Sequence, residues 1–286
     1  MTDSRVVVGV DGSPLAKTAV LQAAHVASSR GLPLHLLHAL APDLPMLGFG
    51  EPSHRDVVTE HGRALLRDAA ARAHAAHPDL TVTTALTDGF ASHALVTTSR
   101  RAALVAVGAV GHSLQSRASL GAVAMQVLTH AACPVLVVDH ESTGSPVPGS
   151  RVVVGVDGSE ASLDALRAAV REAAALDGVV EVVHAWQPRG ASDPTLAAAS
   201  SWEDYEAEIG RRVDGAVASM RASHPDPKVE LHVEREDPVH ALVTHSAGAG
   251  LLVVGSRGSG GFQGLHVGAT TLRLVARSAC PTLVIR

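Results

Sequence analysis

Arg5-Val-Val-Val-Gly-Val-Asp-Gly-Ser13 occurs a second time in this chain, as Arg151-Val-Val-Val-Gly-Val-Asp-Gly-Ser159, 146 residues further on. Each copy contains three consecutive valines, the pattern of a parallel strand that is buried on both faces. Each ends in Asp-Gly-Ser, where the serine stands at the position of a helix N-cap. In the first copy Pro14 follows at the first helical position, where its missing N–H costs nothing. The stretch therefore predicts a buried strand, a turn and a helix in both halves.

Two later motifs also repeat, at an offset of 147 residues: Gly108-x2-Gly111-x9-Gly121-Ala122 returns as Gly255-x2-Gly258-x9-Gly268-Ala269, and Cys133-Pro134 returns as Cys280-Pro281. Offsets that agree to within one residue indicate two copies of one domain. We predict domains at 1–140 and 151–286, joined by a linker at 141–150 that is rich in Gly, Ser and Pro.

Short β-branched runs alternate with longer Ala-rich stretches in each half. We predict strands in the first half at 5–11, 33–40, 80–86, 103–108 and 134–139, with helices at 14–30, 53–77, 90–100 and 119–131. The second half repeats the series, with strands at 151–157, 179–186, 228–235, 251–255 and 281–286 and helices at 160–176, 200–223, 238–248 and 268–278. Such βαβ units build a doubly wound parallel sheet with helices on both faces.

The bulk composition excludes several classes of protein. A length of 286 residues suffices for two domains with their own cores, and an aromatic content of 2% leaves Val, Leu and Ala to build them. A net charge of -5 without a basic stripe argues against a nucleic-acid partner. No apolar run reaches the roughly eighteen residues of a membrane helix. The first residues leave no room for a signal peptide, and we expect a cytoplasmic protein. Its two equivalent cysteines should be reduced thiols, with a disulfide between them as the less favoured alternative.

The glycine-rich segment carries the first chemical signal. Gly108 ends a predicted strand, Gly111 lies in the following loop and Gly121 opens a helix. Glycines at these places let backbone amides approach an anion, and a helix N-terminus adds unpaired N–H donors, so the segment suits phosphate. The first loop also holds His112 and Arg117, and the second holds Arg257 as its cation. The alternative interpretation is a flexible turn without a ligand.

Asp11 and Asp157 carry the second signal, because each follows a buried strand and should emerge at its carboxyl end. If the first and fourth strands are neighbours, each carboxylate faces the glycine loop, at the edge where open α/β sheets bind ligands. A carboxylate there suits the donors of a base or ribose. The alternative role is turn or capping chemistry, since Asp-Gly is also a common turn signal.

Together these motifs resemble the universal stress protein family, and the tandem arrangement resembles its actinobacterial members. Val254-Gly-Ser-Arg-Gly-Ser-Gly-Gly-Phe262 and Ala132-Cys-Pro-Val-Leu-Val-Val138 are typical strings. The resemblance implies five-stranded parallel sheets of order 3-2-1-4-5. It implies ATP as ligand in one subset of the family, with or without Mg²⁺. It also implies a homodimer or an intrachain pseudo-dimer formed through the last strands.

The resemblance extends the candidate nucleotide-binding residues in both halves. In the first half it implies Gly9, Asp11, Gly108, Gly111, Arg117, Gly121 and Ala122, and in the second Gly155, Asp157, Gly255, Gly258, Gly268 and Ala269. Arg257, the cation of the second loop, completes the candidate residues of the second half. The nucleotide-binding subset usually has Ser or Thr after the third glycine, where this chain has Ala122 and Ala269. Loss of one neutral hydrogen bond weakens binding about two- to tenfold. Thr270 and Thr271 are candidates to compensate in the second half.

Other features invite weaker interpretations. The seventeen histidines include His74 with His77 and His35 with His38, but neither pair has the accompanying ligands of a metal site. Trp186, Trp202 and Tyr205 border the second of two long loops, 41–51 and 187–200, which are candidate lids. For these aromatic residues packing is favoured over stacking on a base.

Three functions remain open at this point. The leading hypothesis is a stress-response regulatory protein that changes conformation or partner when it binds an adenine nucleotide. A slow ATP hydrolase is the second, although the chain lacks a Walker lysine motif and a nucleophile–base pair. A nucleotide-free dimerisation scaffold is the third. If both halves bind nucleotide, we expect the second to bind more tightly, because its loop is nearer the family pattern.

Overall fold

The computed structural model describes residues 4–40, 52–111, 120–139, 147–186, 201–219, 228–258 and 266–286. The chain divides into two compact units, Met1–Ser145 and Pro146–Arg286, which we call the first and the second unit. Each unit is described by itself. The predicted lids, Arg117, His112 and most of the predicted linker lie outside the described residues.

The elements of the first unit are β1 (Arg5–Gly9), α1 (Pro14–Ser29), β2 (Leu34–Leu40), α2 (Pro52–Ala76), β3 (Val82–Asp88), α3 (Ala91–Ser99), β4 (Ala102–Gly108), α4 (Ala122–His130) and β5 (Val135–Val138). Those of the second unit are β6 (Val152–Gly155), α5 (Glu160–Ala175), β7 (Val180–Ala185), α7 (Trp202–Ala218), β8 (Val229–Glu234), α8 (Pro238–Ser246), β9 (Leu251–Gly255), α9 (Ala269–Val275) and β10 (Thr282–Ile285). Every predicted strand and helix is present, with ends that differ by a few residues.

Parallel pairing fixes the same topology in both units. In the first, β1 pairs with β2 and β4, β2 pairs with β3, and β4 pairs with β5, which gives the order β3-β2-β1-β4-β5. In the second, the corresponding pairs give β8-β7-β6-β9-β10. The order 3-2-1-4-5 that the family resemblance implies is therefore confirmed for each unit.

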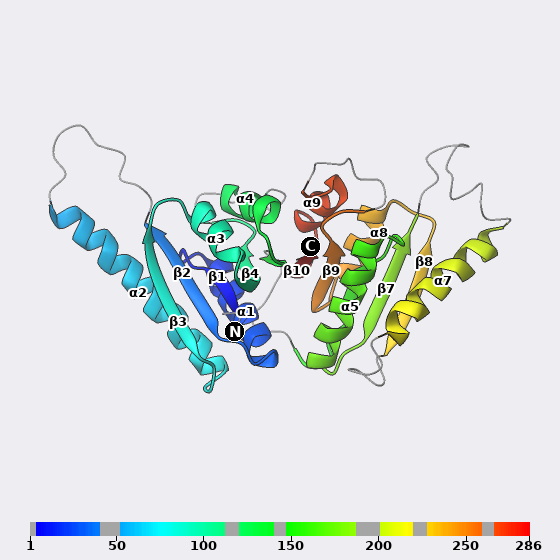
Figure 1. Ribbon diagram of the computed structural model, residues 1–286, viewed down its shortest axis with the longest axis horizontal. Helices are drawn as coiled ribbons and strands as arrows, with labels where there is room; N and C mark the ends of the chain where they lie inside the picture. The colour runs from blue at the N-terminus through cyan, green and yellow to red at the C-terminus, as the bar shows by residue number, and fades with distance from the viewer. Residues whose placement is uncertain are drawn as a thin grey trace. The chain divides into compact units, whose positions relative to one another are not determined.

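Helices cover both faces of each sheet (Figure 1). In the first unit α1 contacts α2 on one side and α3 contacts α4 on the other, and in the second unit α5 contacts α7 while α8 contacts α9. The central strands are correspondingly buried: Val6–Val8 and Val152–Val154 have no exposed surface. Burial on both faces explains why these strands are continuous valine runs instead of alternating patterns.

The predicted N-caps are confirmed. The hydroxyl of Ser13 accepts the N–H of Ala16 at 3.2 Å, and that of Ser159 accepts the N–H of Ser162 at 3.3 Å. Pro14 is the first residue of α1, as its φ preference predicts. These caps start α1 and α5 immediately after the turn that holds the predicted site aspartates.

A charged network joins α8 to the sheet in the second unit. The buried carboxylate of Glu181, on β7, binds Arg151 and Nδ1 of His245. His245 lies on α8, and its Nε2 contacts Glu234 Oε1 on β8 at 2.7 Å. His232 adds a ring 5.2 Å from the His245 ring, between centroids. One histidine therefore links a helix to two neighbouring strands through two carboxylates.

Two further findings concern the whole described chain. Cys133 and Cys280 are both buried, and neither forms a disulfide bond. Within the described ranges, no helix combines the length and apolar character needed to cross a membrane.

Candidate nucleotide-binding site

The strand order places a topological switch point at the carboxyl end of β1 and β4. From β1 the chain builds outward through β2 and β3, and then returns to the other side of β1 with β4 and β5. Open α/β sheets bind ligands in the crevice at such a point. The second unit has the same arrangement at β6 and β9.

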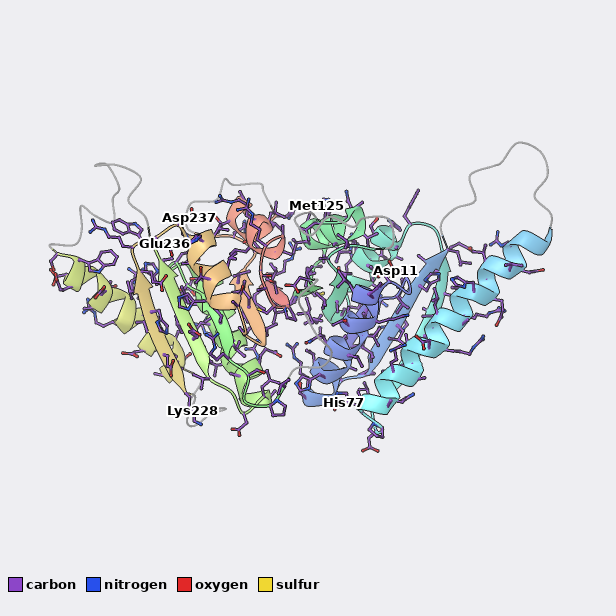
Figure 2. All side chains as sticks on the ribbon, turned by 180° about the vertical axis from the view of Figure 1, so that it is seen from behind. Asp11, His77, Met125, Lys228, Glu236 and Asp237 are labelled. Carbon is purple, nitrogen blue, oxygen red and sulfur yellow. The ribbon has the colours of Figure 1, made fainter. Side chains whose placement is uncertain are left out.

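Asp11 follows β1 at this edge of the first unit (Figure 2). Its Oδ1 accepts the backbone N–H of Ser13 at 2.9 Å. Its Oδ2 faces the glycine loop after β4 so closely that a Cβ on Gly111 would lie 2.7 Å from it. Gly12, between Asp11 and Ser13, has a φ of +83°, which explains why glycine occupies the turn.

Asp157 repeats this arrangement in the second unit. Its Oδ1 accepts both the N–H of Ser159, at 3.1 Å, and the hydroxyl of Ser159, at 2.6 Å. Its Oδ2 would lie 2.5 Å from a Cβ on Gly258. Both predicted roles of the aspartates are therefore compatible: one oxygen organises the turn and the other faces the loop. The expectation that each carboxylate faces its glycine loop is confirmed.

The glycine loop is closed at its base in both units. The N–H of Gly121 donates to the Ala109 carbonyl at 2.8 Å, and that of Gly268 donates to the Ser256 carbonyl at 2.8 Å. Gly121 is the N-cap of α4 and supplies no side-chain cap. The first turn of α4 therefore opens toward the loop with N–H groups that a helix cannot satisfy internally.

Four predicted site glycines have a packing role that is independent of any ligand. A Cβ on Gly9 would lie 3.1 Å from Leu95 of α3, and one on Gly155 would lie 2.8 Å from Leu242 of α8. A Cβ on Gly108 would lie 2.8 Å from Leu15 of α1, and one on Gly255 would lie 3.1 Å from the carbonyl of Ala161 of α5. These glycines let helices pack closely on the ends of the strands.

The hydroxyl missing after the third glycine is not replaced by Thr271. Its side chain is buried and its hydroxyl donates to the Gly255 carbonyl at 2.9 Å, which uses its single hydrogen. The suggestion that Thr271 compensates for the missing hydroxyl was therefore wrong, because the side chain at the third position of α9 points into the unit. Ala122 and Ala269 are both exposed at the first position of their helices, and Arg257 is exposed in the second loop.

Two histidines contact the peptides that precede the aspartates; the sequence analysis considered His38 only as part of a metal pair and did not consider His184. Nδ1 of His38 contacts the Val10 carbonyl at 2.6 Å, and Nδ1 of His184 contacts the Val156 carbonyl at 2.6 Å. His184 is only 2% exposed. Burial is the main cause that lowers the pKa of His184, and Arg212 lowers it further, against the opposing effects of the Val156 carbonyl and Asp157. The recurrence of histidine at an offset of 146 residues was the available signal.

Arg212 is a further residue that sequence reasoning missed. It lies on α7, and its Nη1 would be 2.9 Å from a Cβ on Gly158, so the guanidinium lies over the Asp157–Ser159 turn. Glu208 Oε1 accepts its Nε at 2.9 Å. In the first unit Gly12 lines a small pocket together with Leu65 and Arg72 of α2.

The tryptophans pack on each other. The rings of Trp186 and Trp202 stack with centroids 5.5 Å apart at 26°, and the Arg235 guanidinium lies 5.6 Å from the Trp202 centroid. This pair joins the start of α7 to the end of β7, which supports the packing interpretation. The side chain of Tyr205 lies outside the described set.

Three of the four histidines in the two sequence pairs contact other groups. His35 Nδ1 contacts Thr83 Oγ1 at 2.9 Å, whereas His38 binds the Val10 carbonyl, and His77 lies 5.9 Å from His25 between ring centroids. Among the described residues, no group of three or more His, Cys, Asp or Glu side chains is arranged to hold a metal ion.

The comparisons with known proteins agree with this architecture. The model of the universal stress protein family matches residues 4–139 and 150–286. A universal stress protein of Mycobacterium tuberculosis strain H37Rv is 33% identical over 291 residues, covering 98% of this chain and 96% of its own length. One of Mycolicibacterium smegmatis is 30% identical over 296 residues, covering 100% and 98%. The chain therefore belongs to the universal stress protein family and carries two of its domains.

A solved structure shows the same fold. The universal stress protein of Archaeoglobus fulgidus DSM 4304 matches with a TM-score of 0.72 at 19% identity, covering 100% of this chain and 99% of that one. At this identity the likeness concerns the fold alone, and the chemistry of the site rests on the residues of this chain.

Proposed function

We propose that this protein is a stress-response regulator that binds an adenine nucleotide, with ATP as the first candidate. The observation that carries the proposal is the carboxylate of Asp11 against Gly111, repeated by Asp157 against Gly258. An aspartate at the switch point suits the hydroxyl and amino donors of a nucleoside, while glycine amides and helix N–H groups suit its phosphates.

The phosphates would lie along the glycine loop in each unit. Backbone donors of this loop do not depend on side chains, so the alanines at 122 and 269 should weaken binding without abolishing it. In the second unit Arg257 adds an exposed cation at the same loop. Mg²⁺ that accompanies a nucleotide is usually bound by one or two carboxylates together with the phosphates. If it accompanies ATP here, the phosphates would hold it mainly, and the carboxylate that faces the loop is Asp11 in the first unit and Asp157 in the second.

The proposal is tested by calorimetric titration of the full chain with ATP, alongside mass spectrometry of protein purified without added nucleotide. We expect saturable binding that is reduced when Asp11 or Asp157 is replaced. Absence of binding at millimolar ATP would contradict the proposal and leave the scaffold hypothesis. Steady phosphate release that is lost in Asp157→Ala would instead identify a hydrolase.

Assembly is the remaining part of the proposal. From the family resemblance we propose pairing through the last strands, within one chain or between two chains. Sedimentation velocity with and without ATP measures the mass of the particle. A change in mass or shape on addition of ATP would connect nucleotide binding to the choice of partner.

A further inference from the structure

We infer that His38 and His184 are positioning residues of the two candidate nucleotide sites, each fixing where the aspartate of its site emerges. This inference rests on the proposed function. Neither histidine needs to contact the ligand, since each acts through the peptide that precedes the aspartate. The observation that carries it is the pair of contacts from Nδ1 to the carbonyls of Val10 and Val156, both 2.6 Å long.

The chemistry of the contact assigns the tautomer. A backbone carbonyl only accepts hydrogen bonds, so the hydrogen must be on Nδ1 of each ring. For His184 this fits a ring that burial holds neutral, with its pKa below the usual value. Each histidine, on β2 or β7, thus donates its Nδ1 hydrogen to the carbonyl just beyond the end of the neighbouring strand.

The hydrogen bond from His38 lies where the chain leaves β1, and it therefore affects the orientation of Asp11. The last paired residues of β1 and β2 are Gly9 and Leu37, and the N–H of Val10 still donates to the Leu37 carbonyl at 2.9 Å. Beyond that point the chain leaves the sheet for the turn. The Val10 carbonyl belongs to the planar peptide that begins Asp11, so the His38 ring fixes the orientation from which Asp11 departs.

The carboxylate tolerates little error in that orientation. One oxygen of Asp157 binds the N–H of Ser159, and the other would lie 2.5 Å from a Cβ on Gly258. A tilt of the preceding peptide would move the carboxylate away from the loop or into it. The first unit also makes room for its ring: a Cβ on Gly62 of α2 would lie 2.8 Å from His38 Cδ2.

A matched pair of substitutions separates positioning from simple packing. His184→Leu removes the donor, whereas His184→Asn leaves an amide N–H near the place of Nδ1, and the two replacements are similar in size. Both are made in the full chain with Asp11→Ala, so that ATP titration reports the second unit. We expect His184→Leu to weaken ATP binding about two- to tenfold, the effect of one lost hydrogen bond, and His184→Asn to stay close to the parent.

The outcomes of the titrations and of the crystal structures separate positioning from packing. Equal weakening in both variants, or no weakening in His184→Leu, overturns the positioning role. If the parent itself binds no ATP, the proposed function fails, and crystal structures of the two variants still test the inference. The expected result there is an Asp157 carboxylate that leaves Gly258 in His184→Leu and remains beside it in His184→Asn. An unmoved carboxylate in His184→Leu overturns it, and His38→Leu with His38→Asn provides the same test in the first unit.

Discussion

Gly258 faces the carboxylate of Asp157 so closely that a Cβ at position 258 would lie 2.5 Å from Oδ2. Real Cβ contacts are not this short, so alanine must displace the carboxylate or the loop. The φ of Gly258 lies outside the left-handed region, so the backbone itself accepts alanine and the contact alone is at stake. The closeness of these two residues is the geometric basis of the first prediction.

Gly258→Ala should weaken ATP binding by the second unit about two- to tenfold, the range of one lost hydrogen bond, because the displaced Asp157 carboxylate would leave its place beside the loop. Calorimetric titration in the Asp11→Ala background measures the loss. Gly215→Ala is the control, because a Cβ at this position of α7 meets nothing within 4 Å. That change should stabilise the helix by about 1 kcal/mol and leave ATP binding unaltered. Unchanged affinity in Gly258→Ala would show that the carboxylate does not contact the ligand.

Asp157→Ala should reduce ATP binding by the full chain more than Asp11→Ala does. The second unit has Arg257 at its loop and Arg212 over its turn, and both cations favour a polyphosphate. Parallel titrations of the two variants rank the sites. Asparagine at the same positions keeps an oxygen for the turn, so Asp11→Asn and Asp157→Asn separate loss of charge from loss of the turn. The reverse ranking would contradict the expectation that the second unit binds more tightly.

Ala269→Ser should strengthen ATP binding by the second unit about two- to tenfold, the range of one restored hydrogen bond. Residue 269 is exposed at the first position of α9, beside the loop. Thr271→Val serves as the contrast, because its buried hydroxyl binds the Gly255 carbonyl. It should lower the free energy of unfolding by about 1 kcal/mol through that lost bond, with little direct effect on ATP. If Ala269→Ser binds no better than the parent, the phosphate does not lie at the start of α9.

Arg212→Leu should weaken ATP binding by the second unit about three- to tenfold at low ionic strength, and less at high salt, because the guanidinium is half exposed and screened. Arg211→Leu is a matched control. Arg211 also binds Glu208, at 2.7 Å, but only Arg212 lies over Gly158. Titrations at two salt concentrations measure both variants. Equal effects of the two replacements would mean that the charge of α7 acts only at long range.

The stability of the second unit should depend on pH through His245 and Glu181. Burial lowers the pKa of His245, but its bonds to Glu234 and Glu181 outweigh this and raise it above its ordinary 6.5. Burial likewise raises the pKa of Glu181, but His245 and Arg151 outweigh it and bring it below 4.5. His232 also faces Glu181 Oε1, at 3.7 Å.

The signs follow from these directions. A raised histidine pKa stabilises the fold fully below about 6.5, and this contribution is lost as the pH rises through the folded value. A lowered carboxyl pKa stabilises the fold above about 4.5 and is lost as the pH falls through the folded value. The network therefore contributes most between about pH 4.5 and 6.5. Urea unfolding measured from about pH 4.5 to well above pH 6.5 should show stability declining above about pH 6.5, and His245→Gln should flatten that decline. A slope that persists in His245→Gln would assign it to other groups.

Local patterns were sufficient to predict the helices, the strands and the α/β class, because each element has its own signal in the sequence, whereas the strand order came from the family resemblance. The valine runs at Val6–Val8 and Val152–Val154 indicated buried strands, and the serines at 13 and 159 indicated helix starts. The contact of Asp11 with its loop also followed once β1 and β4 were placed side by side. Boundaries were less certain: α4 begins at Ala122, three residues after its predicted start, because Gly121 takes the extended conformation of an N-cap.

Contacts that depend on how one element rotates against another could not be predicted in this way. Arg212 reaches Gly158 because of the rotation of α7 on its sheet, which the amphipathic pattern of a helix defines only coarsely. His184 binds a backbone carbonyl, and because every residue has one, the sequence does not indicate this partner. Thr271 was misjudged because the rotation of α9 on its sheet decides whether the hydroxyl points to the ligand or to the Gly255 carbonyl.

The stacked tryptophans have a practical consequence for all these measurements. The chain contains two tryptophans, Trp186 and Trp202, and both belong to the second unit. Tryptophan fluorescence of the unmodified protein therefore reports on the second unit and not on the first. Because the pair joins α7 to the end of β7, its emission and its near-ultraviolet dichroism should change when α7 shifts. The protein thus carries its own optical reporter for the unit that we expect to bind nucleotide more tightly.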